Sequence, residues 1–173
     1  MAEPSSWLRL KAPAGRLILQ GDAGARAAAA GVWGVPLSEQ ACRANRNEGR
    51  ASLWLGPDEH LLYQPNFDSP LPIDALEAAL APHPHSLVDV SHRQVALEIS
   101  GPNAALILAG ACPLDLDLDH FPIEMCTRTV LAKAEIVLWR TASDVFHLEV
   151  WRSFFDYAHE LLIEISRDCS SIA

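Results

Sequence analysis

Apolar and polar residues follow the same order of patterns twice along this chain of 173 residues. Short alternating or continuous apolar runs are typical of strands, and apolar residues spaced three or four apart are typical of helices. In the first half these patterns predict a strand, a helix, two strands joined by a turn, and a second helix, at residues 16–20, 22–31, 50–55, 60–63 and 72–80. Asp22 is a suitable N-cap for the first helix, and Gly31 is expected to end it.

The second half predicts the same elements in the same order. A strand, a helix, a strand region, a returning strand and a closing helix are expected at residues 95–99, 102–110, 129–140, 145–151 and 153–166. Helical spacing predicts that the closing helix buries Phe154, Tyr157, Leu161 and Ile165. The segment Val88–Val90 is expected to add a strand that bridges the two halves.

The repeated order indicates a duplication. Leu97 follows Leu17 by 80 residues in the first strands, and Ala142 follows Pro57 by 85 residues in the turns, so the loops absorb a small difference. A sheet with helices on one face is a stable way to bury both kinds of element. We therefore predict an α+β fold that is a tandem duplication of two βαββα units, residues 16–82 and 87–166, within a single domain.

Composition and charge narrow the possible functions. Half of the residues are hydrophobic, which supports a sizeable core, and the formal net charge is -9. The chain has only two lysines, so we expect no nucleic-acid partner, because binding phosphates needs clustered basic residues. The longest apolar run, residues 27–35, is too short to span a bilayer, and no signal peptide is evident. We expect a cytoplasmic protein with no membrane partner.

The sequence lacks the spacing of common cofactor sites. Its four cysteines form no Cys-x-x-Cys pair, and the segment containing His83 and His85 has no third ligand nearby. A calcium loop starting at Asp115 would have His120 where glycine is required. No Gly-x-Gly-x-x-Gly or Walker loop is present. We therefore expect no metal site on this chain, and no nucleotide, FAD or NAD site of its own.

Asp89, Ser91 and His92 are residue types found in serine hydrolases. However, Ser91 and His92 are adjacent, and adjacent side chains on a strand point to opposite faces. A serine nucleophile needs a base within hydrogen-bonding distance. We therefore expect no catalytic residue here. Asp89 and Ser91 should instead bind nearby backbone groups, and His92 and Arg93 should lie at a strand turn or a subunit contact.

Several motifs together resemble one protein family. Residues 89–93, Asp-Val-Ser-His-Arg, followed by residues 99–104, Ile-Ser-Gly-Pro-Asn-Ala, are similar to a signature of the sarcosine oxidase gamma subunit family. The resemblance covers about residues 16–166 and includes the segments 53–59, 112–116, 121–122, 133–140 and 152–157. It is the ordered set of motifs that makes the match specific.

The resemblance implies a fold similar to the folate-binding domain of glycine-cleavage aminomethyltransferases. In those enzymes a strand carries a pair of aspartates, and the matching residues here are Ala134 and Glu135. One carboxylate is therefore missing and the other is longer. The resemblance makes five residues candidates for a vestigial folate cleft or a subunit contact: Asp89, Ser91, His92, Arg93 and Glu135.

The family implies a non-catalytic gamma subunit that supports oxidative demethylation of sarcosine to glycine. By resemblance, FAD, FMN, NAD and tetrahydrofolate belong to the whole complex. The alpha subunit is the implied direct partner, and through it the beta and delta subunits. One or two of the five tryptophans could anchor that contact. The alternative is a stand-alone tetrahydrofolate-binding module, and an independent folate-dependent transferase is disfavoured by the missing carboxylate.

Overall fold

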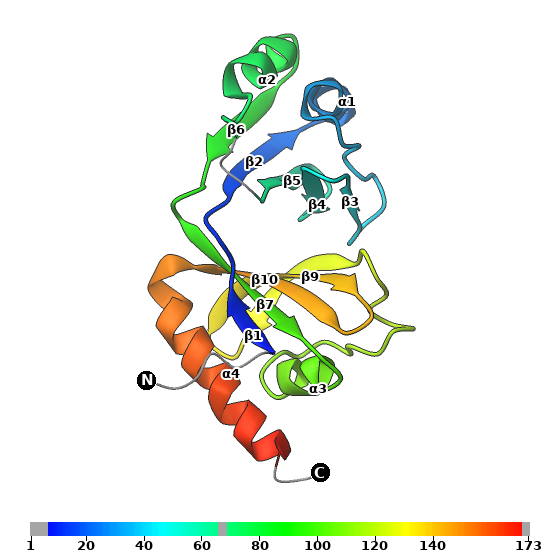
Figure 1. Ribbon diagram of the computed structural model, residues 1–173. Coiled ribbons are helices and arrows are strands. Elements are labelled where there is room, and N and C mark those ends of the chain that lie inside the picture. Colours follow the sequence, from blue (N-terminus) through cyan, green and yellow to red (C-terminus); the bar gives the residue numbers. More distant parts are fainter. Residues whose placement is uncertain (1–6, 66–68, 171–173) are drawn as a thin grey trace. The chain divides into compact units, whose positions relative to one another are not determined.

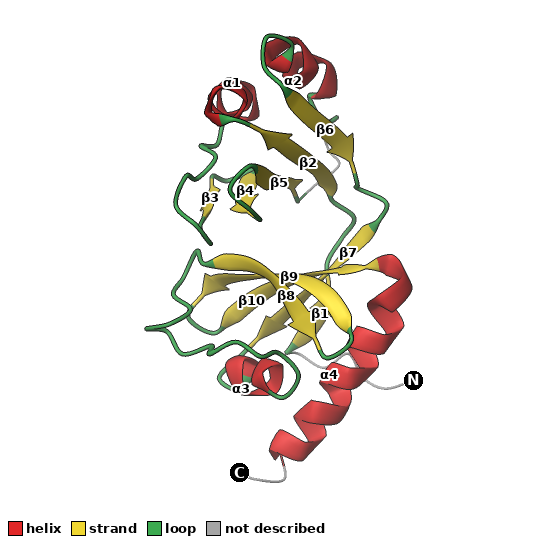
Figure 2. Cartoon of the chain, turned by 180° about the vertical axis from the view of Figure 1, so that it is seen from behind, coloured by secondary structure: helices red, strands yellow, loops and turns green. Residues whose placement is uncertain are grey.

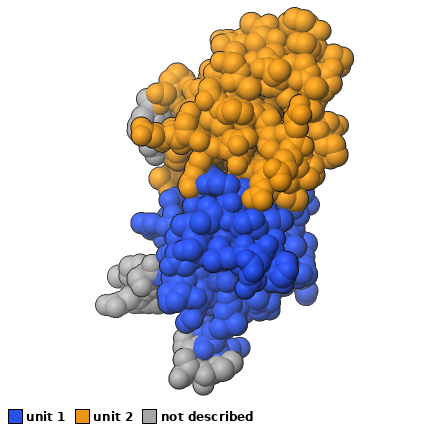
Figure 3. Space-filling model, turned by 90° about the vertical axis from the view of Figure 1, so that its right-hand side faces the viewer, with its two compact units in different colours: residues 1–11, 92–173 blue, residues 12–91 orange. Residues whose placement is uncertain are grey.

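The computed structural model describes residues 7–65 and 69–170. The chain folds into two compact units, which are coloured separately in Figure 3. The N-terminal unit contains residues 12–91, and the C-terminal unit contains residues 1–11 and 92–173. Each unit has its own sheet and its own hydrophobic core.

The N-terminal unit is an antiparallel sheet with two helices side by side on one face (Figure 1). The strand order is β3-β4-β5-β2-β6. Leu17 and Leu62 of the sheet pack against Trp33 of the first helix and Leu76 of the second. The elements are β2 (Gly15–Gly21), α1 (Ala23–Trp33), β3 (Ala44–Arg46), β4 (Ala51–Trp54), β5 (Glu59–Gln64), α2 (Ile73–Leu80) and β6 (His85–Asp89).

The C-terminal unit repeats this architecture, with its helices α3 and α4 on the same side of its sheet (Figure 2). The strand order is β1-β7-β10-β9-β8. Leu97, Leu138 and Phe146 of the sheet form one core with Leu108 and Leu162 of the helices. The elements are β1 (Leu8–Leu10), β7 (Gln94–Ser100), α3 (Ala104–Ala109), β8 (Cys126–Leu131), β9 (Ala134–Ala142), β10 (Val145–Trp151), the 3-10 turn η1 (Arg152–Phe154) and α4 (Phe155–Ser170).

The two sheets have the same topology. Strands β2, β5, β4 and β3 correspond to β7, β10, β9 and β8, and helices α1 and α2 correspond to α3 and α4. The remaining edge strand is β6 in one sheet and β1 in the other. The predicted α+β duplication is confirmed, but each repeat has one more strand in its meander, β3 or β8. The three residues of β3 are too few to show a period of two.

The predicted strand region 129–140 is in fact a hairpin. Strands β8 and β9 pair up to Leu131 and Ala134, and the turn between them consists of Ala132 and Lys133. Ala132 adopts a left-handed φ of 51°. Because no glycine or proline marks this turn, the apolar pattern on either side resembles a single long strand.

The segment predicted to bridge the two halves belongs to the N-terminal sheet. β6 pairs with β2, with Val88 opposite Ile18 and Asp89 opposite Leu17. The N-terminal unit extends to Ser91, and the C-terminal unit acquires β1 as its corresponding edge strand. The predicted repeats, residues 16–82 and 87–166, were delimited by the order of the elements along the chain. The compact units are delimited by which strands pair, so β6 belongs to the N-terminal unit and β1 to the C-terminal unit. An apolar pattern identifies a strand but not its neighbour.

Charged side chains hold β1 on β7. Glu98 of β7 accepts hydrogen bonds from Lys11 Nζ, at 2.8 Å, and from the guanidinium of Arg9. Burial by itself would raise the pKa of Glu98, but these two bonds outweigh it and hold the pKa below its ordinary value. The ionised carboxylate thus supports the backbone pairing of Arg9 with Glu98.

Helix α1 begins as predicted and ends later than predicted. Asp22 Oδ1 accepts a hydrogen bond from Ala25 N at 2.8 Å, so Asp22 is the N-cap. The helix continues through Gly31 to Trp33, and Gly34 ends it with a φ of 78°. A glycine inside a helix costs about 1 kcal/mol relative to alanine. Complete burial of Trp33 outweighs that cost.

Helix α3 is shorter than expected. Pro102 was predicted to occupy its first position, but the helix begins at Ala104. Gly101 has a φ of 108°, and Ala104 N donates to Gly101 O at 2.9 Å. Residues 101–103 therefore form a turn that leads into the helix.

The buried face of α4 differs from the prediction. Ala158 and Leu162 are fully buried, Leu161 and Ile165 are partly buried, and Tyr157 is 37% exposed. Phe154, also predicted to be buried, is 40% exposed. The reason is that Phe154 belongs to η1, and a 3-10 turn has three residues per turn, so it changes the phase of the apolar face before α4 starts.

This assignment of the buried face can be tested by two truncations on one helix. Leu162→Ala should lower the free energy of unfolding by about 2–4 kcal/mol, because it leaves a cavity in the core. Tyr157→Ala should cost less than about 1 kcal/mol, because the ring is partly exposed. Urea unfolding followed by circular dichroism measures both values. If Tyr157→Ala were the more damaging change, the buried face would be the one predicted from spacing.

His60 is a buried titratable residue in the N-terminal sheet. Its side chain is fully inaccessible, and Nε2 donates to Ser38 O at 2.9 Å. Within the described residues, Nδ1 has no hydrogen-bond partner. Burial lowers the pKa of His60 below its ordinary value, although the bond to Ser38 opposes part of the shift. The folded protein therefore holds this imidazole neutral.

We expect the free energy of unfolding to fall as the pH drops below about 6.5, because unfolded His60 then binds a proton that the folded side chain resists. The variant His60→Gln keeps a donor for Ser38 but cannot titrate, so it should lose less stability on acidification. Urea unfolding at about pH 8 and about pH 5.5 measures the difference. An equal loss in both proteins would show that His60 does not contribute.

Candidate functional site

Asp89 and Ser91 have local structural roles at the end of β6. Ser91 N donates to Asp89 Oδ1 at 2.8 Å, and Ser91 Oγ accepts from Arg16 N at 2.9 Å. Ser91 is buried and Asp89 is exposed. The serine hydroxyl thus satisfies backbone groups of the neighbouring strand β2, which is the role expected from the sequence.

His92 and Arg93 lie on an exposed turn at the start of the C-terminal unit. Their carbonyls accept hydrogen bonds from Arg152, from Nε to His92 O at 3.1 Å and from N to Arg93 O at 2.9 Å. The Arg93 guanidinium lies over the Trp151 ring, 5.5 Å from its centroid. The turn is therefore attached to the junction between β10 and η1.

Glu135 lies near the start of β9, with its side chain 57% exposed. The Arg128 Nε atom on β8 is 3.9 Å from Glu135 Oε1. The preceding residue, Ala134, is completely buried in the core. These two residues occupy the places of the paired aspartates in the resemblance, so this strand presents one exposed carboxylate and one buried methyl group.

The five candidate residues fall into three groups. Asp89 and Ser91 contact each other in the N-terminal unit, and His92 and Arg93 share contacts with Arg152 in the C-terminal unit. Glu135 pairs with Arg128. In the described part of the chain, no three His, Cys, Asp or Glu side chains form a group that could hold a metal ion. No helix among the same residues is long and apolar enough to cross a membrane.

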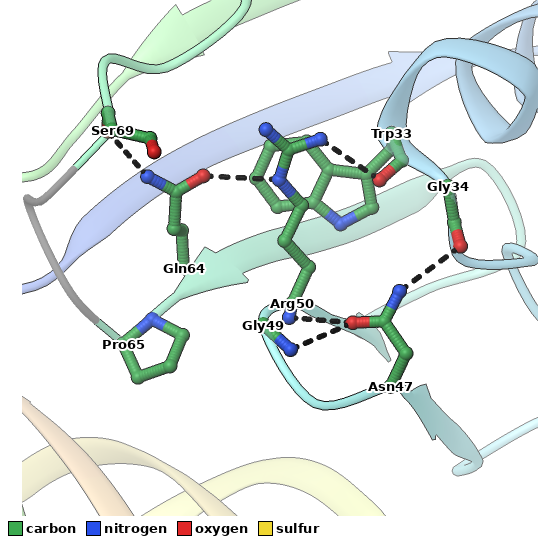
Figure 4. Close-up of a pocket in the computed structure, with 8 residues that line it drawn as sticks. All are labelled: Trp33, Gly34, Asn47, Gly49, Arg50, Gln64, Pro65 and Ser69. Carbon is green, nitrogen blue, oxygen red and sulfur yellow. Dashed lines mark hydrogen bonds between the residues drawn. The ribbon is translucent and has the colours of Figure 1, made fainter.

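A cavity that sequence reasoning missed lies within the N-terminal unit (Figure 4). Its volume is about 440 Å³. It lies where the C-terminal end of α1 meets the loop before β4 and the end of β5. The residues that line it are Trp33, Gly34, Asn47, Gly49, Arg50, Gln64, Pro65 and Ser69.

Arg50 is the charged residue of this cavity, and it is held from several sides. Its guanidinium lies over the Trp33 ring, with the central carbon 4.6 Å from the ring centroid. Arg50 Nε donates to Gln64 Oε1 at 3.0 Å, and Nη1 donates to Trp33 O at 3.1 Å. The last carbonyls of a helix attract a cation, so Arg50 also stabilises the end of α1.

The loop that carries Arg50 is organised by Asn47. Asn47 Oδ1 accepts from Gly49 N at 2.9 Å and from Arg50 N at 2.8 Å, while Nδ2 donates to Gly34 O at 3.2 Å. The Trp33 ring is anchored by a bond from Nε1 to Ala51 O at 3.0 Å. The sequence feature that could have pointed to this cavity is the turn pattern Asn-Glu-Gly before Arg50. This pattern predicts a loop, but it does not indicate which residues the loop packs against.

Comparison with known proteins assigns the chain to a family. The model of the sarcosine oxidase gamma subunit family matches residues 20–168. Sarcosine oxidase subunit gamma from Corynebacterium sp. (strain U-96) is 35% identical over 147 residues, which cover 85% of this chain and 70% of that protein.

Solved structures agree with this family and with the fold. Heterotetrameric sarcosine oxidase from Corynebacterium sp. U-96, in complex with pyrrole 2-carboxylate, contains a chain that matches with a TM-score of 0.85 and 33% identity, covering 92% of this chain and 83% of that one. Aminomethyltransferase T of the glycine cleavage system from Bartonella henselae matches with a TM-score of 0.69 and 14% identity, covering 92% of this chain and 46% of that one. The second likeness concerns the fold alone and confirms the predicted fold type. The chain belongs to the sarcosine oxidase gamma subunit family.

Proposed function

We propose that this chain is the gamma subunit of a heterotetrameric sarcosine oxidase, where it supports oxidative demethylation of sarcosine to glycine. The observation that carries the proposal is the match with a chain of the heterotetrameric enzyme, at a TM-score of 0.85 over 92% of this chain. The family match over residues 20–168 supports the same conclusion from sequence. The other subunits of such an enzyme are then the partners of this chain.

The proposed role is non-catalytic. Each candidate residue has a local structural contact that explains its presence: Ser91 with the backbone of Arg16, and Glu135 with Arg128. A folate site like that of the aminomethyltransferases would need two carboxylates where this chain has a buried Ala134 and an exposed Glu135. The residues present therefore do not fit that chemistry. FAD, FMN and NAD are proposed to lie on the larger subunits, with tetrahydrofolate as the one-carbon acceptor of the complex.

The proposed contact with the alpha subunit is the aromatic surface formed by Trp151, Phe154 and Tyr157. These rings are 41%, 40% and 37% exposed, and Phe154 and Tyr157 meet edge to face at 6.5 Å. Arg93 extends this surface by lying over Trp151. Aromatic and arginine side chains are enriched in protein interfaces, whereas exposed aromatic rings are uncommon on a surface that faces only water.

The proposal predicts that the tagged chain co-purifies with flavin-bearing subunits from its own cells. The eluate should show flavin absorbance and should consume oxygen when sarcosine is added. Trp151→Ala should weaken capture of the other subunits by about tenfold or more, because a central tryptophan is a common hot spot. Leu106→Ala is a matched control, since Leu106 is an exposed apolar residue on α3 in the same unit.

A chain that elutes alone and colourless would contradict the subunit role. The alternative, a stand-alone tetrahydrofolate-binding module, then predicts saturable binding of tetrahydrofolate to the purified chain, measured by calorimetry. Under that alternative, Arg93→Ala and Glu135→Ala should weaken binding, since both residues are candidates for the folate cleft. Under the gamma-subunit proposal, neither change alters any property of the isolated chain beyond a small effect on stability.

A further inference from the structure

The described lining of the cavity beside α1 carries one formal positive charge and no formal negative charge. Arg50 is its charged lining residue, and none of the described residues that line it is acidic. The carbonyl of Trp33 and the amide oxygen of Gln64 each accept one hydrogen bond from the guanidinium, but neither carries a formal charge. A cation without a neighbouring carboxylate attracts an anionic ligand, and the low dielectric of the protein beside it strengthens that attraction.

The guanidinium also keeps donors available. Nε and Nη1 are used, but Nη2 makes no hydrogen bond or ion pair with any residue in the described ranges 7–65 and 69–170. Figure 4 shows this nitrogen on the upper edge of the guanidinium, without a dashed line. Each terminal nitrogen of arginine carries two hydrogens, so Nη1 retains a second donor beside Nη2. Together they form a two-donor edge, which is the geometry that binds a carboxylate at both oxygens.

This edge is held in place before any ligand arrives. Stacking on Trp33 fixes the plane of the guanidinium, and the bonds to Gln64 and Trp33 fix its rotation within that plane. Gln64 is buried and its amide nitrogen donates to Ser69 O at 2.7 Å, so the acceptor for Nε is itself anchored. A preorganised donor does not lose side-chain entropy on binding, which is the main cost for a flexible surface arginine.

We propose that the Arg50 cavity is a binding site for a small organic carboxylate. The carboxylate would accept from the Nη1 and Nη2 edge, and the rest of the molecule would lie in the cavity beside Asn47, Gly49 and Pro65, because Trp33 is fully buried beneath the guanidinium. Among the described residues that line the cavity, none is acidic, so the described lining has no carboxylate to receive an ammonium group and favours a simple acid over a zwitterionic amino acid. A volume of about 440 Å³ suits a molecule of several heavy atoms. The site lies wholly within the N-terminal unit, so it is independent of the proposed aromatic contact and of the proposed subunit role.

The decisive comparison is between acetate and acetamide, which have the same shape and differ in charge. Acetate titrated into the full-length chain should shift the Arg50 Nε–H and Trp33 Nε1–H NMR signals with a dissociation constant on the order of 1–10 mM, as expected for one charge-assisted contact. Acetamide and sodium chloride at matched concentrations should leave both signals unchanged. N-acetylglycine is a third probe: tighter binding than acetate points to a peptide C-terminus as the natural source, and equal or weaker binding points to a free acid.

Two variants distinguish acetate binding at Arg50 from a general effect of the positive charges of the protein. Arg50→Lys keeps the charge and a donor for the helix end, but it lacks the two-donor edge, so acetate binding should weaken about tenfold. Arg167→Gln removes an exposed positive charge from α4 in the other unit and should leave binding unchanged. Absence of a saturable acetate shift in the wild-type chain would overturn the proposal, as would an equal shift with acetamide. Neither result bears on co-purification with the flavin-bearing subunits.

Discussion

Pairing between strands that are distant in the sequence holds each unit together. β2 lies between β5 and β6, and β7 lies between β10 and β1. Each of these two strands is therefore hydrogen-bonded to a neighbouring strand on both sides. The pairing of Leu8 with Ile99 joins two segments of that unit that are separated in the sequence by the whole N-terminal unit. These pairings orient the apolar faces on which the helices pack, and both cores depend on them. Glu98, with Lys11 and Arg9, adds charge-assisted bonds to the most distant of these pairings.

The same topology serves different chemistry in the two repeats. The end of α1 and the loop before β4 enclose a cavity with Arg50 stacked on Trp33. The corresponding strand in the other unit, β9, carries the exposed Glu135, which pairs with the exposed Arg128 of the neighbouring strand β8. Duplication therefore supplied two copies of one scaffold, and side chains at the loops and strand ends made them different. Function in such a fold is argued from the site and not from the architecture.

Membership of the sarcosine oxidase gamma subunit family agrees with a chain whose polar residues mainly stabilise its own fold. Ser91 and Asn47 bind backbone groups, and Arg152 holds the turn of His92 and Arg93. The exposed rings of Trp151, Phe154 and Tyr157 are a different class of feature, because nothing in the fold requires them to face solvent. The proposed scaffold role needs both kinds of feature, a stable fold and a surface that a partner can cover.

The sequence by itself determined the fold class, the duplication and the family, because these depend on local periodicity and on motifs that are contiguous in the chain. Asp22 as an N-cap and the alternation of Phe146, Leu148 and Val150 followed from the same local rules. Only the tertiary structure decided that residues 85–89 pair with β2, that η1 turns Phe154 outward, and that Arg50 lies on Trp33. Each of these depends on which distant segments meet. A period of two or 3.6 residues states which face of an element is apolar, but the neighbour that covers this face is chosen by long-range pairing and packing.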